Sequence, residues 1–139
     1  MANSERHTGV REEFRPLTDR EREILLMLLS VEMSGIEELR VQAAHSRAAR
    51  WKCGCASFNL IVDKNAAPRS AVTARPVVEA MTKQRDDVDA AFDLLLWVED
   101  GWLHSVEIVD YMETHGDDSP DEIPPPEVWD VPAARAPQG

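Results

Sequence analysis

The chain has 139 residues, a length typical of a single folded domain. It carries 26 acidic and 15 basic residues and a formal net charge of −11. This charge argues against a general binder of nucleic acid or of anionic membranes, because both functions require local positive charge. The sequence shows no signal peptide and no apolar run near the roughly 20 residues that span a bilayer, so we expect a cytoplasmic protein.

The acidic excess is concentrated towards the C-terminus. Residues 113–139 hold seven acidic residues and one basic residue, and six of the nine prolines lie between positions 120 and 137. Such a segment favours extended backbone over helix or central strand. We therefore divide the chain into a polar arm (1–16), a single domain (17–111) and an acidic, proline-rich tail (112–139).

Two helices are expected at the start of the domain. Thr18 and Glu21 have the spacing of a capping box, and apolar residues follow at helical spacing. Ser34 and Glu37 form a second such box, which is expected to begin another helix. In that helix the expected inward residues are Ile36, Leu39, Ala43 and Ala44, and the expected outward residues are Glu38, Arg40, Gln42 and Arg47.

Strands are expected in the second half of the domain. From Cys53 to Val62 the apolar period is two, as in a strand, and a second strand is expected over residues 76–82. Residues 91–111 predict an antiparallel hairpin, with either a two-residue turn at Asp100 and Gly101 or a three-residue loop over 99–101 with Gly101 as a bulge.

The three-residue loop is preferred because it collects the large apolar side chains on one face and buries no glutamate. That face is expected to hold Phe92, Leu94, Leu96, Val98, Trp102, His104, Val106 and Ile108. The opposite face is expected to hold Asp93, Leu95, Trp97, Leu103, Ser105, Glu107 and Val109. This mixed face is the expected place for a partner or for the tail.

Together the elements predict an α+β fold, in which an N-terminal helix pair packs on a three- to four-stranded, mainly antiparallel sheet. The capped helix, the sequence MSGIEELR, the CGC strand opening and the WVEDGWL hairpin resemble a family of small uncharacterised bacterial proteins, chiefly actinobacterial. The resemblance covers Leu17 to Asp110. It implies a fold but no functional residues, because no activity is assigned to that family.

The pair Cys53 and Cys55 is the sharpest local motif. Residues i and i+2 of a strand share a face, so both thiolates could reach one zinc ion, with His45 and His104 as the available further ligands. The alternative is that both cysteines are small, half-buried strand residues and that His104 is a neutral imidazole packed beside Trp102. One CxC pair is a weak match to zinc spacings, so no cofactor is expected and zinc remains the alternative.

Trp129 is unusual because it is a large aromatic residue in an acidic, proline-rich tail. The sequence IPPPEVW, which ends at Trp129, is typical of a linear anchor that docks into a groove. The groove belongs either to a partner protein or to this chain's own sheet face around Trp97 and Leu103. The sequence leaves both alternatives open.

The sequence contains no HExxH, GxSxG or CxxC motif, and its six glycines are too scattered for a phosphate-binding loop, so no catalytic residue is proposed. Charge and size favour a non-enzymatic module that binds a basic protein partner, such as an adaptor or an inhibitor. The alternative is a metal- or small-molecule-binding protein built on the cysteines and histidines. A homodimer through Leu95, Trp97 and Leu103 is a third hypothesis.

Overall fold

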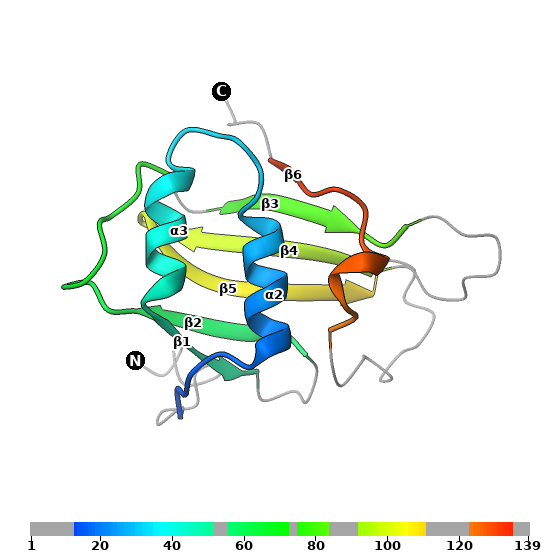
Figure 1. Ribbon diagram of the computed structural model, residues 1–139, viewed down its shortest axis with the longest axis horizontal. Helices are drawn as coiled ribbons and strands as arrows, with labels where there is room; N and C mark the ends of the chain where they lie inside the picture. The colour runs from blue at the N-terminus through cyan, green and yellow to red at the C-terminus, as the bar shows by residue number, and fades with distance from the viewer. Residues whose placement is uncertain (1–12, 52–55, 73–74, 84–91, 111–122, 135–139) are drawn as a thin grey trace.

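The computed structural model describes residues 13–51, 56–72, 75–83, 92–110 and 123–134. Within these ranges, two helices lie on one face of a six-stranded antiparallel sheet (Figure 1). The elements are α2 (Asp19–Leu28), α3 (Ile36–Ala44), β1 (Ser46–Arg50), β2 (Phe58–Val62), β3 (Arg75–Met81), β4 (Phe92–Glu99), β5 (Trp102–Asp110), the 3-10 turn η1 (Pro126–Val128) and β6 (Ala133–Ala134). The strand order is β1-β2-β5-β4-β3-β6, which confirms the α+β class but gives more strands than expected.

The capping box at the start of α2 is confirmed. Thr18 Oγ1 accepts a hydrogen bond from the Glu21 backbone N–H at 3.1 Å, and Glu21 Oε1 accepts one from the Thr18 N–H at 2.9 Å. The buried Glu21 carboxylate also accepts hydrogen bonds of 2.6 and 3.0 Å from the Arg15 guanidinium. The cap is therefore tied to the segment that precedes the helix, and Ile24, Leu25 and Leu28 are directed into the core.

The start of α3 differs from the prediction. Its N-cap residue is Gly35, in the left-handed region at φ 89°, so Ser34 does not cap the helix. A Cβ atom at Gly35 would lie 2.7 Å from Ser70 Oγ, which in turn donates a hydrogen bond of 2.8 Å to the Gly35 carbonyl. The loop after β2 thus approaches the helix start more closely than a residue with a side chain would allow.

Strand β1 is an element that the sequence did not predict. Arg47 was expected on the outer side of a helix and Ala44 on its inner side, but the helix ends at Ala44, which is exposed, and Arg47 lies in β1. All five β1 residues pair with β2, and Ala48 is fully buried. Pairing with β2 and burial of Ala48 therefore override the helix preference of an alanine- and arginine-rich segment.

The turn between β4 and β5 is a two-residue turn, so the preferred three-residue loop was wrong. Asp100 and Gly101 both have positive φ, at 56° and 86°, and Glu99 pairs directly with Trp102. Positive φ at both central residues is the geometry of a type I′ turn, which matches the twist of a hairpin.

A bulge at His104 follows this turn. Val98 pairs with Leu103, whereas Trp97 pairs with Ser105, so His104 is the extra residue on β5. Beyond the bulge the side chains return to the expected faces, although the register differs by two residues from that of a three-residue loop, and the predicted buried face is correct for Leu94, Leu96, Val98, Val106 and Ile108. Leu103 is 3% exposed and takes the place in the core that was expected for Trp102 and His104.

Gln42 was expected to face solvent, but its side chain is fully buried. Its Nε2 atom donates hydrogen bonds of 2.9 Å to the carbonyls of Pro68 and Gly101, and its Oε1 atom accepts one of 2.9 Å from the Leu103 N–H. A single carboxamide therefore links α3 to the loop after β2, to the second residue of the β4–β5 turn and to the start of β5. Burial of this polar group is tolerated because these hydrogen bonds replace those to water.

Residues 123–134, which belong to the predicted tail, pack on the domain. Ile123 and Trp129 are each 3% exposed and join the hydrophobic core, and η1 contacts α2. The Ile123 carbonyl accepts a hydrogen bond of 2.7 Å from Arg20, and β6 pairs with β3. Figure 1 shows this segment passing in front of the end of the sheet and then along the edge of β3.

We predict that Gln42→Leu destabilises the fold by roughly 1–3 kcal/mol, because leucine of similar size leaves the buried Leu103 N–H without the Gln42 acceptor and removes one donor from the carbonyls of Pro68 and Gly101. Chemical denaturation of both proteins measures the loss. Val41→Ala, an exposed position on the same helix, is the matched control and is expected to stay within about 0.5 kcal/mol of the parent chain. An equal loss in the two variants would contradict the role assigned to the carboxamide.

Candidate functional site

The candidate site is the face of the sheet opposite to the helices, which we call the outer face. It is formed by β3, β4 and β5, whose pairing places side chains in cross-strand rows on one side. The three rows are Pro76, Trp97 and Ser105; Glu79, Leu95 and Glu107; and Met81, Asp93 and Val109. Both helices and η1 cover the other side, as Figure 1 shows.

The middle row of the outer face places an apolar side chain between two carboxylates. Leu95 pairs with Glu79 on one side and with Glu107 on the other, and all three are half-buried. Trp97 Nε1 donates a hydrogen bond of 2.9 Å to Glu107 Oε1. This hydrogen bond holds the Glu107 carboxylate over the strands and fixes the orientation of the indole ring.

Asp93 is the most perturbed acid among the described residues. Burial raises the pKa of its carboxyl group above the ordinary value, and the negative charge of Glu79 raises it further. Its Oδ1 atom is buried and has no hydrogen-bond partner within the described part of the chain. Burial and the Glu79 charge therefore destabilise the ionised form of the Asp93 carboxyl group. A positive charge placed beside the outer face would stabilise that ionised form.

Of the two predicted surface residues Trp97 and Leu103, only one lies on the outer face. Trp97 is there, half-buried, as expected. Leu103 is in the hydrophobic core on the helix side, because the His104 bulge reverses the direction of the residues before it. The predicted surface that combined Trp97 with Leu103 was therefore wrong, and the proposed dimer face loses that residue.

Trp129 packs against its own domain, but not on the sheet face around Trp97 that the sequence alternative named. Its Nε1 atom donates a hydrogen bond of 3.0 Å to the Pro124 carbonyl, and its backbone forms a bridge with Thr82 at the end of β3. The ring is 3% exposed in the core cluster, on the helix side rather than beside Trp97. In this conformation Trp129 is not accessible as an anchor for a partner.

The predicted zinc site is only partly within the described structure. Cys53 and Cys55 lie outside the described residues, so their proposed role stays a prediction. In the described ranges, no group of three or more His, Cys, Asp or Glu side chains is placed to hold a metal ion. His45 is the exposed C-cap residue of α3, and His104 is exposed at the β5 bulge with Nδ1 3.4 Å from Glu99 Oε1.

The sequence missed Glu79 as a member of the outer face. Asp93, Leu95, Trp97 and Glu107 were assigned to one face from the hairpin alone, since alternation within a hairpin is local. Glu79 joins them through the pairing of β3 with β4, which includes an irregularity between Pro76 and Val78. A register that depends on a bulge in a separate strand has no signal in the sequence.

Comparison of the chain with protein-family models, with curated proteins and with solved structures gives no match. The resemblance to a bacterial family therefore stays a prediction. Neither described helix has the length and apolar character required to cross a membrane.

We predict that Asp93→Asn stabilises the protein at neutral pH. The raised pKa means that the folded state disfavours the ionised carboxylate of Asp93. This residue therefore lowers the free energy of unfolding at pH values above its folded-state pKa. The loss disappears as the pH falls below the unfolded-state pKa near 3.8. Thermal melts at several pH values test this, with the advantage of Asn largest at neutral pH and absent in acid. A constant difference at all pH values would show that charge is not the cause.

Proposed function

We propose that the chain is a binding module whose outer face engages a protein partner through basic side chains. The observation that carries this proposal is the row in which Leu95 lies between Glu79 and Glu107, next to the Trp97 indole. None of the nine outer-face positions is lysine or arginine. An arginine or lysine on the partner would complement this surface in charge, and arginine would also stack on the indole.

Apolar and charged groups on the outer face have different roles in this proposal. Trp97, Leu95 and the 46% exposed Met81 offer apolar area, from which most of the binding free energy of an interface arises. The carboxylates of Asp93 and Glu107 set the orientation of the partner and speed its association. A face that spans three strands and carries both kinds of group fits a folded partner better than a small ligand.

A second copy of the chain is a poor occupant of this face. A two-fold interface would bring the same three carboxylates of each copy towards one another, and like charges across an interface are unfavourable. The homodimer hypothesis also relied on Leu103, which is buried in the core. Charge complementarity therefore favours a basic partner over self-association.

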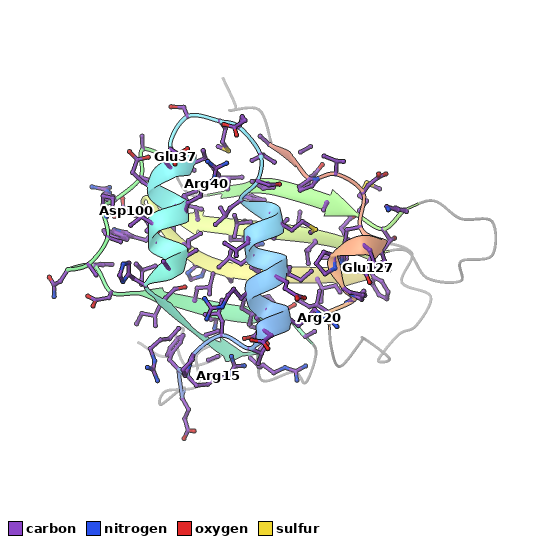
Figure 2. The ribbon with its side chains drawn as sticks, viewed as in Figure 1. Arg15, Arg20, Glu37, Arg40, Asp100 and Glu127 are labelled. Carbon is purple, nitrogen blue, oxygen red and sulfur yellow. The ribbon has the colours of Figure 1, made fainter. Side chains whose placement is uncertain are left out.

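The proposal assigns partner binding to the sheet rather than to the tail. Because the Trp129 ring is buried in the domain, the described tail offers no exposed aromatic anchor. Its exposed acidic residues are Glu127, which lies on η1 on the helix side of the sheet (Figure 2), and Asp130, which follows η1 along the chain. This arrangement makes Glu127 a suitable control for any effect of acidic charge outside the outer face.

We predict that Glu107→Lys weakens binding to the partner by at least about ten-fold, because it replaces an attraction by a repulsion at the centre of the outer face. Glu127→Lys makes the same charge change on η1 and is expected to leave binding unchanged. Tagged full-length protein carrying each change is used for affinity capture from native cells at low and high salt, and the captured basic protein is then purified and titrated.

Glu107→Gln separates charge from structure in the same assay. Glutamine can still accept the hydrogen bond from Trp97, so it should keep the fold while weakening a salt-sensitive complex. Equal capture by all variants, or loss of capture in Glu127→Lys alone, would overturn the outer-face proposal. A dimer of the purified chain in light scattering that Glu107→Lys abolishes would identify a second copy as the occupant.

A further inference from the structure

Strands β2 and β5 separate from each other at one end of the sheet. They pair at only two positions, Phe58 with Val106 and Asn59 with Ser105, although β2 continues to Val62. The separation begins where the His104 bulge adds a residue to β5. The bulge therefore opens a fork between two neighbouring strands.

A cavity of about 380 Å³ occupies this fork. The apolar residues that line it are Leu60, Ile61, Val62 and Leu103, of which Ile61 is exposed and the others are buried in the core. Its other lining residues are Lys64, Glu99, Asp100, Trp102 and His104. The cavity thus places an indole ring and two acidic residues beside an exposed apolar side chain.

The fork cavity already contains a cationic group from this chain. Lys64 Nζ lies 5.1 Å from the centroid of the Trp102 ring, within the range of a cation–π interaction. Lys64 itself is exposed in the loop after β2, so its flexible side chain can leave without disturbing a strand. The ammonium group shows which chemistry the Trp102 face accepts.

The two carboxylates that line the cavity are held by other residues. Glu99 Oε1 lies 3.4 Å from His104 Nδ1, and Asp100 forms a salt bridge with Arg69 across the turn, in which Arg69 Nε also donates a hydrogen bond of 2.9 Å to the Asp100 carbonyl. Figure 2 shows Asp100 at the outer end of the hairpin, beside α3. Arg69 offsets the charge of Asp100, so the Glu99 carboxylate is the group that an entering cation would meet at the mouth of the cavity.

We propose that the fork cavity binds a primary alkylammonium group, which displaces the Lys64 ammonium from the face of Trp102. An alkyl stem would lie against Ile61, while its ammonium group would lie between the indole ring and the carboxylate of Glu99. Anionic ligands are disfavoured by Glu99. This site does not depend on the proposed partner of the outer face.

The experiment titrates the full-length chain with n-butylammonium, which has the four-carbon stem of a lysine side chain, and follows the indole N–H signals by NMR. Trp102→Phe assigns the Trp102 signal among those of the four tryptophans. We expect millimolar binding that shifts the Trp102 signal, because so small a ligand has few atoms to contribute. Butanol, which has the same stem without the charge, is expected to bind more weakly.

The Lys64→Ala variant provides the decisive comparison. Removal of the internal competitor should tighten n-butylammonium binding by about two- to five-fold, the effect expected of an exposed cation–π contact. Lys83→Ala, which removes an equal charge from an exposed position that does not line the cavity, should leave the affinity unchanged. Trp102→Leu should weaken binding in a chain whose amide spectrum shows it to be folded.

Three results would overturn the proposal. These are equal binding of butanol and n-butylammonium, an unchanged affinity in Lys64→Ala, and an equal gain in Lys83→Ala. The first would indicate an apolar cavity without cation selectivity, and the third would indicate only a general effect of net charge. Because Glu107→Lys does not alter the fork cavity, loss of the outer-face partner and loss of n-butylammonium binding are separate outcomes.

Discussion

The carboxamide of Gln42 connects three parts of the chain that are far apart in the sequence. It binds the carbonyls of Pro68 and Gly101 and the N–H of Leu103, in a position from which water is excluded. The helix layer is therefore joined to the sheet by directional hydrogen bonds as well as by apolar packing. Since apolar contacts alone tolerate sliding, these hydrogen bonds set where α3 stands along the β4–β5 hairpin.

The end of the hairpin held by Gln42 also determines where the two candidate surfaces lie. The tight turn at Asp100 and Gly101 sets which residues of β4 and β5 pair next to it, and the bulge at His104 shifts this pairing by one residue. Beyond the bulge, the shifted register aligns Glu107 with Leu95 and so builds the outer face. At the bulge itself, β5 departs from β2 and the fork cavity opens. The inserted residue His104 thus lies between the outer face and the fork cavity.

The parts of the fold that could be predicted are those specified by neighbouring residues. The capping box of Thr18 and Glu21 and the alternation of Leu94, Leu96, Val106 and Ile108 are local patterns, and the structure confirms them. Gln42, β1 and the position of Leu103 were assigned wrongly, because each depends on a partner distant in the sequence. A buried glutamine on a helix has the same sequence signal as an exposed one, and a bulge that corrects a turn has no signal. The outer face was accordingly predicted in its β4 and β5 residues and missed in its three β3 residues.

The pairing of β6 with β3 has a consequence for the order in which the fold is completed. β6 is the last described element along the chain, and it covers part of the edge of β3 that lies opposite to β4. During synthesis on the ribosome, the other five strands emerge before Ala133 and Ala134 do. The edge of β3 is therefore open for this interval, and an open strand edge can pair with another chain. Two exposed alanines thus cover an edge of the sheet that could otherwise pair with another chain.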